Sequence, residues 1–246
     1  MSSPLEEELA EGLEATKEHH KLINFFSARM SKQDELAVRR YVRWSFPMNY
    51  YLNTGKLIYS SYRSSTVSSI STLYEKAKQR FKTELLPSIK YLDNIIQKLP
   101  NKRPQLPHVL WRASRDGLKY ASQDGDIYTF PSFLSTSLRK DISLIFMGSN
   151  KCCLFKMNIR AQVPYLYMSH KSWAKNEMDF HPMYEIMLCR GVQLKQTNQS
   201  TMTINTYGSA LEIDVLEFDL IGHAPVTPIT KLAPPTEILI GVGNPF

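Results

Sequence analysis

Three consecutive small hydroxyl side chains, Ser135, Thr136 and Ser137, directly follow the bulky pair Phe133 and Leu134. The aromatic and β-branched residues of this stretch indicate a strand. Because side chains alternate between the two faces of a strand, Ser135 and Ser137 share one face and Thr136 lies on the other. A face of small hydroxyls can hold a polar ligand closely and can hydrogen-bond a nearby carboxylate. An edge strand with one solvated face would show the same pattern.

Two charged residues interrupt apolar strands elsewhere in the chain. Arg112 lies in the apolar run 109–113, and Glu185 lies in the apolar run 183–189. Burying a charge alone costs several kcal/mol, so each of these residues must be paired, exposed or functional. If the two residues pair with each other or with surface ions, their role is structural.

The arginine, the hydroxyl strand and the carboxylate together favour one chemistry. The planar guanidinium of Arg112 can hold a pyrophosphate through two parallel hydrogen bonds. The hydroxyl face around Ser135 can seat a ribose. The carboxylate of Glu185 can stabilise the positive charge that develops while an N-glycosidic bond breaks. These are the requirements for cleaving nicotinamide from NAD.

The order Arg, Ser-Thr-Ser, Glu resembles the arginine–serine–glutamate clade of the mono-ADP-ribosyltransferases. The resemblance extends over most of the chain. The matching strand motifs are 110–113, 126–137, 153–159, 165–169 and 184–191, and the matching helices before them are 34–52 and 89–93. Ala113 stands where glycine usually follows the arginine.

The resemblance implies an α+β fold in which two small, roughly perpendicular β-sheets form an NAD cleft beside N-terminal helices. It implies that Glu185 is the catalytic carboxylate, that Ser135 orients it, and that Arg112 holds the NAD phosphates. By the same resemblance, the residues expected to contact NAD are Arg112, Ala113, Phe133, Ser135, Thr136 and Ser137.

The resemblance also implies an acceptor protein, which the loop 170–182 would present or recognise with Trp173 and Phe180. Members that modify arginine carry Glu or Gln two residues before the catalytic glutamate, and Met183 holds that place here. A methionine cannot hydrogen-bond a guanidinium or take its proton. The family favours arginine as the acceptor residue, and Met183 weakens that inference.

Three other functions remain open. An NAD glycohydrolase of the same fold would use water in place of the acceptor protein, and Met183 favours it. A non-enzymatic descendant could bind a nucleotide or a protein, but the presence of Arg112, Ser135 and Glu185 argues against it. The net charge of +7 favours a polyanionic ligand or an acidic partner. A nucleic-acid-binding module is the weakest alternative, because no stacking-aromatic motif accompanies the charge.

The elements that would position these residues change type along the chain. Helical periodicity predicts helices at 4–25, from 31 toward Pro47, at 67–87 and at 89–99. Strands are expected at 109–112, 128–137, 152–159, 165–168, 184–189, 192–196 and 211–220, with a short helix at 140–147 and a bulge between Val215 and Glu217. Helices followed by strands indicate an α+β fold. We expect a helical part at 1–105, a β core at 106–225 and an irregular extension at 226–246.

Composition places the chain among ordinary globular proteins, with 43% hydrophobic and 22% charged residues in 246. No apolar run reaches membrane-spanning length. Acidic residues 6–8 stand where a secretory signal needs a basic region, so we expect a cytoplasmic protein, with secretion left open. We also expect a monomer. Cys152, Cys153 and Cys189 fit neither a disulfide framework nor a metal site, and we expect buried structural thiols.

Overall fold

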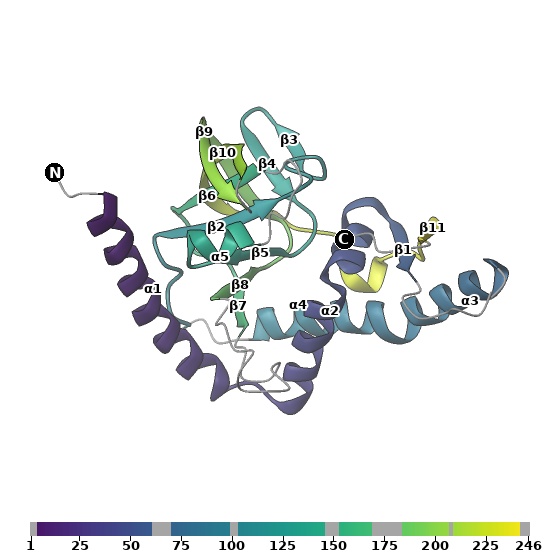
Figure 1. Cartoon of the computed structure of the whole chain (residues 1–246). Coiled ribbons are helices and arrows are strands. Elements are labelled where there is room, and N and C mark those ends of the chain that lie inside the picture. The colour runs from purple at the N-terminus through teal and green to yellow at the C-terminus, as the bar shows by residue number, and fades with distance from the viewer. Residues whose placement is uncertain are drawn as a thin grey trace.

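The computed structural model describes residues 4–60, 70–98, 103–145, 153–168, 184–206 and 209–241. Helices dominate the N-terminal half and strands the remainder, so the fold is α+β as expected (Figure 1). The main helices are α1 (Pro4–Ser27), α2 (Lys32–Thr54), α3 (Ile70–Arg80) and α4 (Leu86–Lys98), and a π-helical turn (Phe81–Leu85) joins α3 to α4. A short helix, α5 (Lys140–Ile145), follows within the β region.

Helix α2 runs beyond the proline toward which it was expected to extend. Ser31 and Asp34 form a capping box at its start, and Gly55 ends it with a left-handed φ of 69°. Pro47 lies inside the helix, which continues to Thr54. The later turns remain helical because Met48 and Tyr51 are buried in the main core. This continuation brings additional polar residues of α2 to the candidate site.

The strands form a curled sheet with the order β3-β4-β9-β10-β6-β2-β5-β8-β7. Their bounds are β2 (Val109–Ser114), β3 (Ser122–Asp124), β4 (Ile127–Phe130), β5 (Leu134–Ser137), β6 (Cys153–Ile159), β7 (Tyr165–Met168), β8 (Glu185–Leu188), β9 (Val192–Thr206) and β10 (Ser209–His223). Strands β2 and β5 are joined through one residue pair, Trp111 and Ser137. The two expected sheets are therefore two arms of one sheet, the second made of β5, β8 and β7.

Several strand boundaries differ from the expected ones. The run 128–137 is divided into β4 and β5, because the chain bends at Pro131 and Ser132. Strand β9 extends far beyond residue 196, because it pairs with β10 along a long hairpin. The expected bulge lies slightly later, between Glu217 and Phe218, and a second register shift lies between Leu220 and Gly222.

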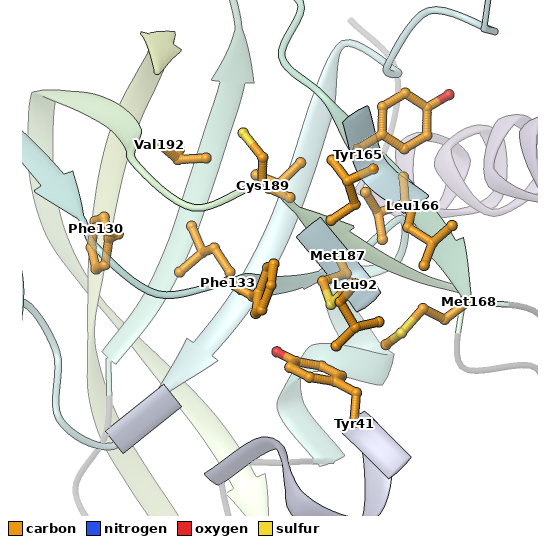
Figure 2. Packing of buried hydrophobic residues seen from close by; sticks show 14 of the residues in the cluster. Tyr41, Leu92, Phe130, Phe133, Tyr165, Leu166, Met168, Met187, Cys189 and Val192 are labelled. Carbon is orange, nitrogen blue, oxygen red and sulfur yellow. The ribbon is translucent and has the colours of Figure 1, made fainter. Parts of the chain in front are cut away.

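The main core extends from the helices across the second arm of the sheet into the first arm. Helices α1 and α4 both contact β7, and α2 packs against α4. Figure 2 shows buried residues of this core, including Tyr41 of α2, Leu92 of α4 and Met187 of β8. Cys189 is buried, as expected, and Cys153 is partly buried, whereas Cys152 lies outside the described residues. Within the described ranges, no helix combines the length and the apolar character needed to cross a membrane.

The C-terminal segment corrects two expectations. Residues 226–246 were expected to be irregular and residues 1–105 to be helical, yet strand β11 (Glu237–Gly241) pairs in parallel with β1 (Lys56–Ser60) (Figure 1). The hydroxyl of Tyr51 donates to the carbonyl of Ala233 at 2.5 Å. Leu57 of β1 is buried in the main core. These two short strands are distant in sequence, so local propensity did not reveal their pairing.

A buried ion pair attaches α4 to the turn after β8. The guanidinium of Arg190, which is 5% exposed, donates to both carboxylate oxygens of Asp93 and to the carbonyl of Thr227. Gly191 follows with a left-handed φ of 81°, and a Cβ at this position would lie 2.2 Å from the carbonyl oxygen of Ala224. The turn therefore requires glycine both for its backbone conformation and for space.

Candidate functional site

Strand register places the candidate carboxylate beside the hydroxyl strand. Glu185 is opposite Ser137 in the antiparallel pairing of β5 with β8, and Ser135 is opposite Met187. Since directly paired residues share a face, Ser135, Ser137 and Glu185 lie on the same face of the sheet. Thr136 lies on the other face, where its hydroxyl donates to the carbonyl of Ile186 at 2.8 Å. Thr136 therefore fastens the two strands together.

Arg112 reaches the same position from the adjacent strand β2. Its Nη1 donates to the backbone carbonyl of Ser135 at 2.7 Å. Burial lowers the pKa of Arg112, while Tyr41 and Glu185 oppose that change. Because a guanidinium carries five N–H donors, the bond to Ser135 leaves further donors for a ligand.

A chain of polar side chains connects helix α2 to Glu185. Asn49 Nδ2 donates to the hydroxyl of Tyr41 at 2.9 Å. The Tyr41 hydroxyl lies 3.0 Å from Ser135 Oγ, and a hydrogen bond from the Ser135 side chain lowers the pKa of Glu185. Strand register places both residues on one face of the sheet, as expected. Sequence reasoning missed Tyr41 and Asn49, although they belong to a helix that it had matched to the family.

The environment of Glu185 opposes its ionisation. Burial raises the pKa of Glu185 from its ordinary value of 4.5 to about 7, and the hydrogen bond from Ser135 and the charge of Arg112 limit that rise. A carboxyl group with this pKa changes its charge close to neutral pH, as is common for groups in active sites. Its ionised form can stabilise a positive charge that develops beside it.

Strand β8 begins with an unusual backbone conformation that α1 supports. Tyr184, directly before Glu185, has a φ of 48°, in the left-handed region that bulky residues rarely occupy. Its ring packs against the imidazole of His19 at a centroid distance of 4.9 Å, and the guanidinium of Arg139 lies 5.4 Å from its centroid. These contacts fix the point from which the Glu185 side chain leaves the backbone.

A cavity of about 330 Å³ lies between α2 and the strands that carry these side chains. This volume is at the lower end of the usual range for ligand pockets. The expected site residues that line it are Arg112, Ala113, Ser135, Thr136, Ser137 and Glu185. Helix α2 contributes Asn49 and Asn53, and among the described residues their buried Oδ1 atoms have no hydrogen-bond partner. Those oxygens could accept hydrogen bonds from a ligand.

Phe133 does not line this cavity, in contrast to the expectation that it contacts NAD. Its side chain is fully buried in the main core. It packs edge-on against Tyr41 at a centroid distance of 5.8 Å, and Figure 2 shows the two rings next to each other. An apolar ring before the hydroxyl strand can face either the core or the cleft, and the position of α2 places it in the core.

The expected acceptor-recognition residues cannot be located. Trp173, Phe180 and Met183, together with the loop 170–182, lie outside the described residues. Their proposed role remains a prediction from the sequence.

No protein-family model matches the sequence, and no curated protein matches it. Solved structures do resemble the fold. Plx2a, an ADP-ribosyltransferase toxin from Paenibacillus larvae, has a TM-score of 0.51 at 15% identity over 85% of this chain and 96% of its own. BECa, an ADP-ribosylating toxin of a binary enterotoxin of C. perfringens solved with NADH, has a TM-score of 0.51 at 14% identity over 85% and 48%.

The enzymatic component C2-I of the C2 toxin from Clostridium botulinum has a TM-score of 0.50 at 13% identity. The match covers 83% of this chain and 46% of C2-I. This chain therefore spans about half the length of BECa and of C2-I, and nearly all of Plx2a. At these identities the likeness concerns the fold, which is that of ADP-ribosyltransferases.

Proposed function

We propose that the protein is an NAD-dependent mono-ADP-ribosyltransferase that cleaves the nicotinamide N-glycosidic bond and transfers ADP-ribose to an acceptor protein. The observation that carries this proposal is the convergence of Arg112, Ser135 and Glu185 on one cavity. Each side chain has the chemistry that one part of NAD requires. The fold and the NADH bound to BECa agree with the proposal.

The proposed mechanism assigns one task to each group. The free N–H donors of Arg112 bind the pyrophosphate, and the face that carries Ser135 and Ser137 seats the nicotinamide ribose. As the bond from the ribose C1′ to the nicotinamide nitrogen breaks, its electron pair leaves with nicotinamide and positive charge develops on the ribose. The ionised carboxylate of Glu185 stabilises that charge. The acceptor nucleophile then bonds to C1′ and loses its proton.

The cavity also offers acceptors for the N–H groups of NAD. The unpartnered Oδ1 atoms of Asn49 and Asn53 are buried at its wall. A buried acceptor without a partner is costly, so a ligand that donates to it gains from the contact. NAD carries N–H donors on its carboxamide and on its adenine amino group.

The acceptor residue is the less constrained part of the proposal. The family favours arginine, whereas Met183 cannot bind or deprotonate a guanidinium. Hydrolysis of NAD, with water in place of the acceptor, is the second candidate, and the identity of residue 183 favours it. The two outcomes share every step up to the release of nicotinamide.

A paired assay of nicotinamide release and of label transfer to an arginine-rich protein tests the proposal. We expect Glu185→Gln to reduce nicotinamide release by roughly 10²- to 10³-fold, because it removes a preorganised group that acts mainly in the transition state. Binding of NAD, measured by calorimetry, should remain close to that of the wild type. Met183→Glu should raise transfer to arginine relative to hydrolysis.

The matched control is Glu212→Gln, which makes the same change at an exposed residue of β10 outside the cavity. It should leave both readouts unchanged. Full turnover in Glu185→Gln would refute the enzymatic proposal. Release without transfer to any acceptor would support the hydrolase instead.

A further inference from the structure

The hydroxyl of Ser135 lies between two oxygen atoms that compete for its proton. One is the carboxyl group of Glu185, which lies on the same face of the sheet and lines the same cavity, and the other is the hydroxyl of Tyr41, 3.0 Å from Ser135 Oγ. A serine hydroxyl has a single proton, so it can donate to only one of them. If the proton goes to Glu185, Ser135 stabilises the ionised carboxylate. If it goes to Tyr41, Ser135 directs a lone pair at the carboxylate instead.

The amide of Asn49 resolves this competition. Its Nδ2 can only donate, so Tyr41 accepts the 2.9 Å bond from Asn49 with its oxygen. Donation by Tyr41 to Ser135 Oγ then satisfies the remaining proton of Tyr41. Ser135 in turn has its own proton available for Glu185. The donor-to-acceptor direction of the whole row of hydrogen bonds therefore follows from the amide of Asn49 at its far end.

We propose that Asn49 and Tyr41 are positioning residues, which orient the Ser135 hydroxyl so that its proton faces Glu185. The catalytic consequence of this inference rests on the proposed function. The hydrogen-bond direction itself does not, because it is a property of the protein without substrate. Tyr41 and Asn49 would then act on Glu185 only through Ser135.

The residues packed around Tyr41 keep the hydrogen bonds in this direction. Tyr41 is fully buried, and its ring packs edge-on against Phe133, so its hydroxyl cannot swing away. Burial also raises the pKa of Tyr41, which therefore stays protonated and able to donate. The buried position of Phe133 thus has a use, since it holds the ring of Tyr41 in place.

Two groups lower the pKa of Glu185, and Asp116 is a further charged residue in the lining of the same cavity. Arg112 of β2 is the cationic group that acts on it, and Ser135 of β5 is its hydrogen-bond donor. Ser137 of β5 and Met168 of β7 are its paired neighbours in the sheet. Because burial opposes the ionised form of Glu185, the direction of the Ser135 hydroxyl determines how much of that effect is offset.

Asn49→Asp tests the direction, because a carboxylate at residue 49 can only accept. Tyr41 would then donate to it, Ser135 would donate to Tyr41, and the lone pairs of Ser135 would face Glu185. The added negative charge also disfavours ionisation of Glu185. The double variant Tyr41→Phe with Asn49→Asp keeps that charge but has no hydroxyl at residue 41 to connect residue 49 with Ser135. Compared with Tyr41→Phe alone, it therefore isolates the effect of the charge on the pKa of Glu185. Asn53→Asp adds the same charge one helical turn further along the cavity wall.

The readout is the titration of Glu185 in the substrate-free protein, followed by NMR with carboxyl-¹³C-labelled glutamate. The Glu185 signal is identified by its absence in Glu185→Gln. We expect Asn49→Asp to raise the pKa of Glu185 by about one pH unit more in the presence of Tyr41 than in the Tyr41→Phe background, as expected for one hydrogen bond to a charged group. Melting curves check that each variant is folded, and the Tyr41→Phe single variant provides a second measurement of the lost donor chain.

Equal changes in the two backgrounds, or no change in either, would overturn the inference. That result would follow if the amide oxygen of Asn49, and not its nitrogen, faced Tyr41. A larger change in the presence of Tyr41 supports the inference even if the wild type releases no nicotinamide, in which case only the proposed function fails. If nicotinamide is released, the midpoint of its pH profile should move upward in Asn49→Asp together with the NMR titration.

Discussion

The proposed function requires the carboxylate of Glu185 to be charged in an environment that disfavours charge. Its side chain lines a cavity covered by α2, and burial raises its pKa to about 7. The hydrogen bond from Ser135 and the charge of Arg112 act in the opposite direction. Because these effects have opposite signs, the group changes its charge within the physiological pH range, and both activity and stability should depend on pH there.

Nicotinamide release should therefore increase with pH through about 7 and reach a plateau above it. Glu185 stabilises positive charge only when ionised, so below its pKa the rate should fall roughly tenfold per pH unit. The measurement is kcat/KM, the initial rate at NAD concentrations well below KM, between pH 5 and 9, because kcat/KM reports the pKa of the free enzyme; the range is roughly two units on either side of this pKa. A rate that stays flat across this range would show that ionisation of Glu185 does not limit the reaction.

The same group should make the stability of the fold depend on pH. In the folded protein the pKa of Glu185, about 7, lies above its ordinary value of 4.5. The folded state thus binds the proton more tightly, and the resulting stabilisation is fully present below pH 4.5 and is lost as the pH rises through 7. Between these two values the free energy of unfolding should fall by roughly 3 kcal/mol relative to Glu185→Gln.

Urea unfolding of the wild type and of Glu185→Gln at matched pH values measures this difference. The comparison removes the pH dependence that both proteins share. Parallel curves for the two proteins would mean that Glu185 is better solvated than its surroundings indicate.

At the scale of elements, the site depends on contacts that hold α4 and the end of β8 together. The pair of Asp93 and Arg190 is largely buried, with side chains 14% and 4% exposed. Removing one member leaves the other charge buried without its partner. The arrangement also includes the carbonyl of Thr227, so the pair connects three separate segments.

Asp93→Asn should therefore lower the free energy of unfolding by about 3–5 kcal/mol. Asp219→Asn is the matched control, because Asp219 pairs with an Arg160 side chain that is 64% exposed. Such surface pairs contribute about 1 kcal/mol or less. Chemical denaturation of both variants measures the two costs, and similar values would show that the Asp93 pair is solvated.

At the scale of the molecule, the C-terminal segment packs against the N-terminal region through a strand pair. Strand β11 pairs with β1, and the Lys56 ammonium lies 2.6 Å from the Glu237 carboxylate. That ion pair is exposed and contributes little. The burial of Leu57 and the backbone bonds of the strand pair are the stronger effects. Strands β1 and β11 form a two-stranded sheet separate from the sheet that carries Glu185, so the contribution of this segment should be to stability.

A chain that ends at residue 231 should melt at a lower temperature. Exposing one buried leucine costs roughly 2 kcal/mol, which corresponds to a decrease of about 4–8 °C for a chain of this size. Thermal melting and amide exchange in β1 measure the effect. An unchanged melting temperature with β1 still protected would show that β11 does not stabilise this region.

The sequence by itself determined which residues could act and which face they share. Arg112 and Glu185 stood out because charges in apolar strands are costly, and Ser135 and Ser137 were assigned to one face because side chains alternate along a strand. Both arguments concern a few neighbouring residues. They also yielded the α+β class, since the change from helical to strand patterns is local.

Only the tertiary structure decided how those residues are surrounded. The pKa of Glu185 depends on burial by α2, the place of Phe133 depends on Tyr41, and the pairing of β1 with β11 joins segments at opposite ends of the chain. Desolvation and long-range pairing depend on which elements come together, and no local pattern specifies that. The sequence therefore identified the candidate site residues, and the packing of helices on the sheet determined their surroundings and orientation.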